Sequence, residues 1–187
     1  MLFPKLAVTG GAGYVGSALV PHLIGVGYDV TVIDLFLYGD DVFDGISGSP
    51  RLHIVKGDIR DTEILKRTFK DADAVIHLAC ISNDPSFELD PDLGKTINYD
   101  AFLGILKAVR HCGNRRLIYA SSSSVYGVRE EPNVREDSPC TPLTDYSKYK
   151  LLCEEDLKSA DIGNCEYVII RPATVCGYAR RMRLDLT

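Results

Sequence analysis

The sequence predicts an α/β protein in which helices cover both faces of one doubly wound parallel sheet. Three observations support this prediction. Short apolar segments alternate with amphipathic segments, a glycine-rich turn joins the first pair, and 187 residues suffice for one domain with a sizeable core. Right-handed crossovers between parallel strands then give the strand order 3-2-1-4-5-6.

The first strand is expected at 6–8 and the first helix at about 15–26, on either side of a glycine-rich turn. The turn holds glycines that fit two spacings, G-x-G-x-x-G and G-x-x-G-x-x-G: Gly10, Gly11, Gly13 and Gly16. Glycines let the backbone approach a pyrophosphate, and the free N–H groups of a helix N-terminus attract it. Such a turn also serves tight packing alone, so the glycines leave both interpretations open.

The second strand, at 29–33, favours the dinucleotide interpretation. It ends at Asp34, about 20 residues beyond the turn, where an acid that binds a ribose is expected. No arginine follows in 35–38 to bind a 2′-phosphate, so NAD is predicted rather than NADP.

The remaining elements follow from apolar periodicity. A glycine- and aspartate-rich loop at 36–49 precedes strands and helices expected at 52–55, after Asp61, at 74–78, at 91–112, at 117–120, from Asp145 and at 167–170. Ligands of such sheets bind beyond the carboxyl ends of the strands, so the loops after the six strands should converge on one cleft.

Two of these loops carry candidate chemistry. A serine-rich segment, 121–124, leaves the fifth strand, and Tyr146 and Lys150 lie four residues apart on one helical face. An ammonium favours the phenolate, and lowering the pKa of a phenol from about 10 to neutrality requires roughly 4 kcal/mol. Y-x-x-x-K alone is common on solvated helices, but its place after a dinucleotide-binding sheet favours catalysis.

Composition excludes several other classes. A formal net charge of −5 gives no footprint for nucleic acid or an anionic membrane, and no apolar run is long enough to span a bilayer. The N-terminal residues lack signal-peptide features, so a cytoplasmic location is expected. Neither the cysteines nor the histidines show metal-ligand spacing, so no metal site is expected and the thiols are predicted to be reduced.

Several motifs together resemble the extended short-chain dehydrogenase/reductases, particularly the NAD-dependent nucleotide-sugar epimerases and dehydratases. The matching segments are T-G-G-A-G-Y-V-G at 9–16, G-D-I-R-D at 57–61, H-L-A-C at 77–80, Tyr146 with Lys150, and R-P-A-T-V-C-G at 171–177. The resemblance implies a Rossmann domain over 1–187 that binds NAD and carries the catalytic residues.

The resemblance also implies a role for individual residues. The catalytic residues would be Ser122, Tyr146 and Lys150. The NAD-binding residues would be Gly10, Gly13, Tyr14, Val15, Gly16, Asp34, Asp58, Ile59, Leu78, Ala79, Cys80, Asn98, Tyr146, Lys150 and Pro172. The nucleotide-diphosphate sugar would contact Ser82, Asn83, Ser122, Ser123 and Tyr146.

The implied reaction is epimerisation through a transient 4-keto sugar. Tyr146 would remove the proton of a C4 hydroxyl while NAD takes the hydride, and the ketone would take it back on its other face. Ser123 and Ser124 stand where the dehydratases carry an Asp-Glu pair, which disfavours dehydration because serine is a poor general acid near neutral pH. A sugar or carbonyl dehydrogenase or reductase, and a non-catalytic NAD-binding module, remain alternatives.

Two expectations concern the rest of the molecule. Relatives usually continue past the R-P turn, so most of the substrate-binding region is expected to be missing, through a fragment or a natural truncation. The nearby Arg180, Arg181 and Arg183 either reach a diphosphate or form a frayed tail. A homodimer is expected through the helices at 91–112 and from Asp145, with these residues off the sheet-facing stripe: Tyr99, Phe102, Leu103, Leu106, Tyr149 and Leu151. The alternative is that a missing segment covers them.

Overall fold

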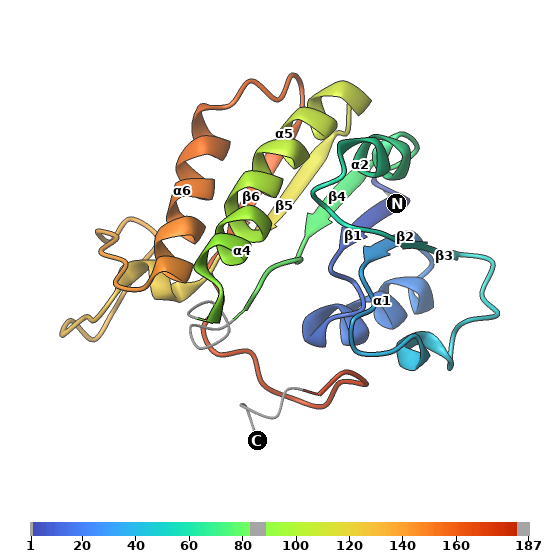
Figure 1. Ribbon diagram of the computed structural model, residues 1–187, viewed down its shortest axis with the longest axis horizontal. Helices are drawn as coiled ribbons and strands as arrows, with labels where there is room; N and C mark the ends of the chain where they lie inside the picture. Colours follow the sequence, from blue (N-terminus) through green and yellow to red (C-terminus); the bar gives the residue numbers. More distant parts are fainter. Residues whose placement is uncertain (1, 83–88, 183–187) are drawn as a thin grey trace.

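Six parallel strands form one sheet in the order β3-β2-β1-β4-β5-β6 in the computed structural model, which describes residues 2–82 and 89–182 (Figure 1). The strands are β1 (Lys5–Thr9), β2 (Asp29–Asp34), β3 (Leu52–Lys56), β4 (Ala74–His77), β5 (Arg116–Ala120) and β6 (Glu166–Ile170). The predicted strand order is confirmed. All the carboxyl ends of the strands therefore meet at one edge of the sheet.

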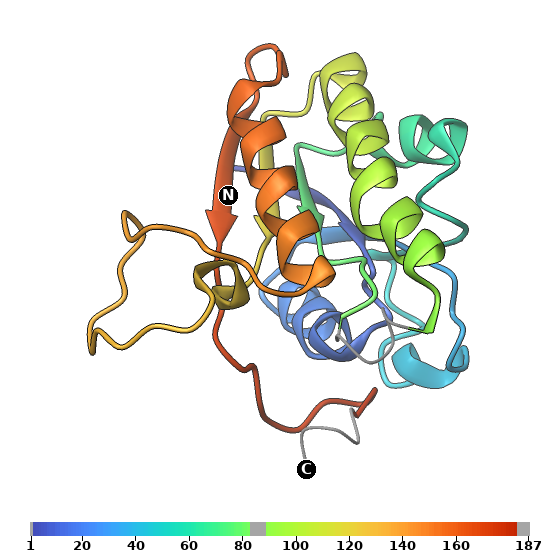
Figure 2. The ribbon, with the colours of Figure 1, turned by 60° about the vertical axis from the view of Figure 1, so that its left-hand side comes forward.

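Helices cover both faces of this sheet, as two views of the ribbon show (Figures 1 and 2). The helical elements are α1 (Tyr14–Gly25), η1 (Asp41–Phe43), α2 (Thr62–Phe69), α4 (Pro91–Lys95), η2 (Thr96–Asp100), α5 (Ala101–Cys112), η3 (Ser123–Tyr126) and α6 (Asp145–Ser159). Of the helices that the structure describes, none is both long and apolar enough to cross a bilayer.

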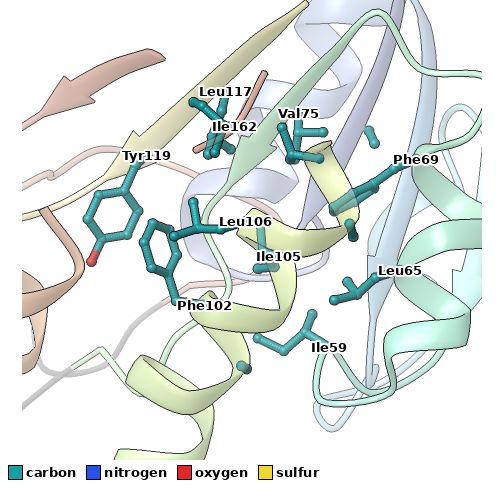
Figure 3. Packing of buried hydrophobic residues seen from close by; sticks show 14 of the residues in the cluster. Ile59, Leu65, Phe69, Val75, Phe102, Ile105, Leu106, Leu117, Tyr119 and Ile162 are labelled. Carbon is teal, nitrogen blue, oxygen red and sulfur yellow. The ribbon is translucent and has the colours of Figure 1, made fainter. Parts of the chain in front are cut away.

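The alternation of side chains along each strand divides the core into two layers. On one face, Val8 and Val32 pack with residues of α1 and with Phe43. On the other face, the strands pack against α2, α5 and α6, where Phe69 and Phe102 are fully buried (Figure 3). The strands are buried on both sides at β1 and β2, as expected for a parallel sheet.

The segment predicted as one helix, 91–112, is helical throughout but contains a π turn, η2, between α4 and α5. Single π turns within helices are frequent at functional sites. The side chain of Asn98 is buried in this turn. The irregularity therefore falls on a residue predicted to help form the site.

The outward orientation predicted for Phe102 is wrong, and Leu106 is nearly buried, although it lines a surface groove between α5 and α6. Phe102 is 0 % exposed and Leu106 is 6 % exposed. The ring of Phe102 lies 5.6 Å from the ring of His77 and stacks on it. The physical reason is that α5 packs on the sheet and is flanked by α2 and α6. These contacts cover more of its surface than the apolar stripe of the helix indicated, so less of it faces solvent.

Candidate functional site

The predicted site residues lie mainly at the carboxyl edge of the sheet, in the loops that follow the strands. Main-chain hydrogen bonds join these loops: Gly10 N–H donates to Ile33 O at 2.8 Å, and Gly57 N–H donates to Asp34 O at 2.9 Å. The loop after β4 is tied to β1 because Leu78 N–H donates to Thr9 O at 3.0 Å. These bonds join the carboxyl ends of β1, β2, β3 and β4. Lys150, which bonds to Ala120 O, adds the end of β5.

Two glycines of the turn are required by the packing of the backbone itself. Gly10 has φ of +72°, and a Cβ there would lie 2.5 Å from Ala79 N. A Cβ on Gly16 would collide with the carbonyl group of Gly11. These two positions require glycine whether or not a cofactor binds. Tight packing of the turn therefore explains two glycines of the motif, without reference to a dinucleotide.

The N-terminus of α1 provides the independent sign of an anion site. No side chain caps this helix at Gly13, and its first turn holds no acidic residue. By contrast, Asp61, Asp90 and Thr144 cap the other α-helices that begin after a loop in the described part of the chain. Uncapped N–H groups at a helix N-terminus, behind a side-chain-free glycine, suit a pyrophosphate.

Asp34 is held in place at the end of β2. Its two carboxylate oxygens accept hydrogen bonds from Ala12 N–H at 3.0 Å and from Phe36 N–H at 2.9 Å. Phe36 has φ of +53°, a conformation that a bulky side chain rarely adopts, and its buried ring packs edge-on to Phe43. A fixed acid beside a strained residue is a common feature of binding sites.

The segment after β3 contains an ion pair that the sequence did not indicate. Asp58 pairs with Arg60, whose Nη2 lies 2.5 Å from the Asp58 carboxylate. This hydrogen bond holds the pKa of Asp58 below its usual value. Ile59 is buried in the core beneath α2 and α5. The adenine contact expected of Asp58 and Ile59 stays a prediction.

The loop after β4 is anchored by Asn98. The amide of Asn98 accepts from Ile81 N–H at 2.8 Å and donates to Ile81 O at 3.0 Å. This two-way bond fixes the course of the chain past Cys80 and up to the exposed Ser82. Asn83 lies outside the described residues.

His77, at the end of β4, belongs to the core. Its Nδ1 lies 2.6 Å from Thr9 Oγ1, and its ring stacks against Phe102 and Tyr119. Burial, with a smaller contribution from the charge of Lys150, lowers the pKa of His77 to about 3. The imidazole is therefore neutral at physiological pH.

The predicted pair Tyr146 and Lys150 is brought together on α6. The Lys150 ammonium lies 5.7 Å from the centre of the Tyr146 ring and donates to Ala120 O at 2.7 Å. Lys150 is 4 % exposed. Burial lowers the pKa of Lys150, but Cys80 and Tyr146 raise it further, so the pKa lies above its usual value. A buried ammonium that is charged at neutral pH therefore lies beside the phenol.

Ser122 is the N-cap residue of the short helix η3 and lies two residues after the end of β5. Its hydroxyl oxygen accepts from Ser124 N–H at 3.1 Å and from Ser124 Oγ at 2.9 Å. With its oxygen occupied in this way, the Ser122 hydroxyl retains its proton to donate. The neighbouring Ser123 N–H donates to Pro172 O at 2.9 Å, which joins this loop to the end of β6.

The segment after β6 runs back across the carboxyl edge toward α1 (Figure 1). Tyr14 Oη donates to Gly177 O at 2.6 Å, and Arg181 lies 3.8 Å from the centre of the Tyr38 ring. Arg180 donates to Asp41 O at 3.3 Å. Of the two alternatives for these arginines, the contacts of Arg180 and Arg181 do not fit a frayed tail, and their contact with a diphosphate stays a prediction. Arg183 lies outside the described residues.

Sequence reasoning missed a buried polar cluster next to this site. Glu154 is fully buried, accepts from Ser121 Oγ at 2.5 Å, and pairs with Arg171 at 2.6 Å. One signal was present in the sequence: Glu154 follows Lys150 by four residues, so it lies on the same helical face. Its partner Arg171 was noted only as part of the R-P turn.

The cysteines and acidic residues form no metal site in the described ranges 2–82 and 89–182. All six cysteines are free. Cys153 and Cys165 are buried, and burial raises the pKa of each thiol, to about 12 and about 11. The prediction of reduced thiols agrees with this structure.

A parallel sheet whose carboxyl edge carries an uncapped helix N-terminus after β1 and a tyrosine–lysine pair beside β5 is the arrangement of the short-chain dehydrogenase/reductase class. The profile of one family in this class, described as the NAD dependent epimerase/dehydratase family, matches residues 6–185. The chain belongs to this family. The family resemblance identified from the sequence is confirmed, and NAD is the cofactor on which that family depends.

Individual relatives of this chain are named as UDP-sugar epimerases. The UDP-glucose 4-epimerase of Lacticaseibacillus casei is 30% identical over 175 residues, which are 92% of this chain and 52% of the relative. A putative UDP-glucose 4-epimerase of Methanocaldococcus jannaschii is 35% identical over 178 residues, 92% of this chain and 56% of the relative. The chain thus spans about half the length of these curated relatives.

Solved structures show the same similarity. The UDP-N-acetylglucosamine 4-epimerase of Methanobrevibacter ruminantium M1, in complex with UDP-N-acetylmuramic acid, has a TM-score of 0.82 at 32% identity, over 91% of this chain and 55% of that chain. The UDP-glucose 4-epimerase of Brucella ovis, in complex with NAD, has a TM-score of 0.79 at 29% identity, over 89% and 51%.

Proposed function

We propose that the protein interconverts the C4 epimers of a UDP-sugar through a transient 4-keto intermediate, with NAD as a bound cofactor. In this proposal, residues 1–187 form the NAD-binding domain and carry the catalytic residues. The observation that carries the proposal is the buried Lys150 ammonium, which lies beside Tyr146 and is bonded to the carboxyl end of β5. The names of the relatives supply the substrate class.

The residues that would hold NAD are those at the carboxyl edge. The uncapped N-terminus of α1 would bind the pyrophosphate, with Tyr14, Val15 and the glycines around it. Asp34 would bind the adenosine ribose, while Leu78, Ala79, Cys80 and Pro172 would line the nicotinamide end. When bound, NAD supplies a hydride acceptor that can return the hydride to the opposite face of the sugar.

The chain's own residues would move and hold the proton. Tyr146, as a phenolate, would remove the proton of the C4 hydroxyl and later return it. Lys150 would favour that phenolate, because a cation a few ångströms from a phenol stabilises its ionised form. Ser122 would donate a hydrogen bond from its hydroxyl to the same C4 oxygen, without transferring its proton. Ser82, Asn83 and Ser123 would contact the sugar.

Dehydration is not proposed, because the position next to Ser122 has no carboxylate. Ser124, whose hydroxyl is bonded to Ser122, and Ser123, whose N–H is bonded to Pro172, occupy the places of the dehydratase acid and base. A serine hydroxyl transfers protons poorly near neutral pH. This leaves redox chemistry at C4 with return of the hydride.

The test is to incubate the whole protein with UDP-glucose, UDP-galactose and their N-acetylated counterparts, and to separate the products by chromatography. Absorbance at the NADH wavelength is followed in the same reactions. Epimer interconversion without NADH accumulation supports the proposal. Stoichiometric NADH with an oxidised sugar would indicate a dehydrogenase instead, and NAD binding without either product would indicate a non-catalytic module.

We also propose that the protein is a homodimer that uses the exposed surface of α5 and α6. A shallow groove of about 300 Å³ between these helices is lined by Leu103, Leu106, Lys107, Arg110, Asp156, Ser159, Ala160 and Asp161. A lining that combines leucines with charged residues suits a contact between proteins. The cytoplasmic location expected from the sequence stays a prediction.

A further inference from the structure

Glu154 is a buried carboxylate that none of the proposed chemical steps uses. It lies on α6, one turn after Lys150 and two turns after Tyr146. Its oxygens accept from Ser121 Oγ at 2.5 Å, Arg171 Nε at 2.9 Å and Arg171 Nη2 at 2.6 Å. Burial raises the pKa of Glu154, but Arg171 and Ser121 lower it further, so the carboxyl group stays ionised.

Arg171 extends this contact to other segments. Beyond its two bonds to Glu154, Nη1 donates to Tyr126 Oη at 2.8 Å and to Glu136 O at 3.1 Å. The guanidinium thus joins the end of β6, the helix α6, the short helix η3 and the loop between η3 and α6. A buried charge pair with this many satisfied partners favours one arrangement of the segments that it joins.

Two successive turns of α6 each form a hydrogen bond to the chain at the end of β5. Lys150 bonds to Ala120 O, and one turn later Glu154 bonds to the hydroxyl of the next residue, Ser121. Ser122 follows immediately, and its other neighbour is bonded to Pro172 O. The position of Ser122 relative to α6, and so to Tyr146, is therefore set from both sides.

We propose that Glu154 is a positioning residue: clamped by Arg171, its carboxylate holds Ser121 against α6 and so sets the separation of Ser122 and Tyr146. The effect on catalysis rests on the proposed function, whereas the clamp, meaning the bonds that join Arg171, Glu154 and Ser121, is a property of the fold. The charge matters because Ser121 Oγ and the two Arg171 nitrogens are donors, and the Lys158 ammonium also lies 3.6 Å from this carboxylate. A glutamine amide would place N–H groups against at least one of them.

The kinetic test uses the whole protein with UDP-galactose and compares four variants. Glu154→Gln should lower kcat by about tenfold or more, because a small misplacement of reacting groups is costly, while KM and bound NAD stay close to those of the unmodified protein. Ser121→Ala should lower kcat in the same way, and Ser121→Thr, which keeps the hydroxyl, should restore it. Asn114→Ala is the stability control, because Asn114 is a buried side chain at the far end of the sheet that bonds to Phe69 O and Ala72 O.

A purely structural role predicts a different pattern. Glu154→Gln and Asn114→Ala would then both lower the melting temperature and leave kcat per folded, NAD-bound molecule unchanged, and this result would overturn the proposal. The double variant Ser121→Ala/Glu154→Gln should be no slower than Glu154→Gln alone, because both changes break one contact. Additive losses in kcat would also overturn it. If Glu154→Gln does not fold, Ser121→Ala decides.

A crystal structure of Ser121→Ala with NAD separates this inference from the proposed function. A longer distance between Ser122 Oγ and Tyr146 Oη than in the unmodified protein supports the clamp, even if no UDP-sugar is turned over. An unchanged distance overturns the clamp, even if the protein proves to be an epimerase.

Discussion

Asp34 has two tasks at the residue scale, and the sequence indicated only one of them. Beyond its predicted ribose contact, its carboxylate holds the glycine turn through Ala12 and the strained Phe36 through its main chain. The acid is therefore oriented before any ribose binds. Preorganisation of this kind lowers the entropic cost of binding.

The first prediction concerns cofactor choice. Asp34→Ala should weaken NAD binding, relax discrimination against NADP, and destabilise the protein by about 1–3 kcal/mol, because two main-chain N–H groups lose their acceptor. Calorimetric titration with NAD and NADP, together with denaturant unfolding, measures the three effects. Tighter binding of NADP than of NAD by the unmodified protein would refute the assignment.

The second prediction concerns the tyrosine–lysine pair. Tyr146→Phe should lower turnover by about 10²–10⁴-fold, the usual contribution of a general base, and leave NAD affinity nearly intact. Lys150→Met should reduce both, since Lys150 is buried, bonds to Ala120 O and lies beside Tyr146. Steady-state rates and NAD content of purified variants test this. Ordinary turnover by Tyr146→Phe would exclude the proposed mechanism.

The third prediction concerns pH and the buried His77. Its pKa is about 3 in the folded protein and about 6.5 when unfolded, so only the unfolded state binds a proton between these values. Stability should therefore fall as the pH drops below 6.5, by about 1.4 kcal/mol per pH unit. Unfolding in urea at pH 7.5 and 5.0 should differ by about 2 kcal/mol from this group.

His77→Gln should lose that share of the pH dependence, whereas His53→Gln should keep it, because His53 is exposed on β3. Equal pH dependence in His77→Gln and in the unmodified protein would show that His77 can take up its proton without unfolding. Carboxylates such as Glu154 contribute mainly at lower pH, and the difference between the unmodified protein and His77→Gln separates this imidazole from other groups that titrate between pH 7.5 and 5.0.

At the scale of elements, the strands and most helix starts could be predicted because their signals are local. Asp61 caps α2 as its position before an amphipathic run indicated, and each strand lies within a residue or two of its predicted range. The predictions that were wrong concern features that depend on contacts between distant segments. The burial of Phe102 requires His77 and Tyr119 from two strands, and the phase of α5 follows a π turn that interrupts the 3.6-residue period.

The candidate site shows the same division. Tyr146 and Lys150 could be paired from their spacing, because one helix positions both. The Glu154–Arg171 pair could not, since an ion pair between a helix and the residue after a later strand requires the fold itself. The contact between Arg60 and Asp58 could not be predicted either. Which of several nearby partners a charged side chain contacts leaves no periodic pattern in the sequence.

The fourth prediction concerns the uncapped helix α1. Gly13 has extended dihedral angles open to any residue, φ −74° and ψ −176°, although a Cβ would lie 3.2 Å from Gly10 O. Gly13→Asp should weaken NAD binding by about tenfold or more, because its carboxylate would cap the helix and repel the pyrophosphate. The stability of the NAD-free protein should stay within about 1 kcal/mol, since the cap offsets the close contact.

Two controls sharpen that test. Gly13→Ala adds the Cβ without the charge and should weaken NAD binding less than Gly13→Asp does. Gly16→Ala should unfold the protein more readily, because its Cβ would collide with Gly11. Equal NAD affinity of Gly13→Asp and the unmodified protein would show that the N-terminus of α1 does not bind the pyrophosphate.

At the scale of the whole molecule, two partly apolar surfaces compete as contact sites. One is the exposed side of α5 and α6, where Leu103 lines the groove and Leu152 is 39 % exposed. The other is the α1 face of the sheet at its edge, where Val168 and Ile170 of β6 are 39 % and 42 % exposed. Apolar side chains gathered on a surface commonly mark an interaction site.

The last prediction assigns self-association to the α5 and α6 surface. Two copies related by a two-fold axis would bring α5 and α6 of each into one four-helix contact, since the same surface then serves both partners. Sedimentation velocity at micromolar concentration should give a dimer. Leu103→Asp should convert it to a monomer, because a carboxylate would be buried against the partner without a counter-charge.

Val168→Asp is the matched variant on the competing surface and should leave the dimer intact. A monomer for the unmodified protein would exclude the interface at that concentration. A dimer broken by Val168→Asp and kept by Leu103→Asp would place the contact on β6 instead. Because the site residues of the proposed reaction all come from one copy of the chain, NAD should bind equally well to the Leu103→Asp monomer.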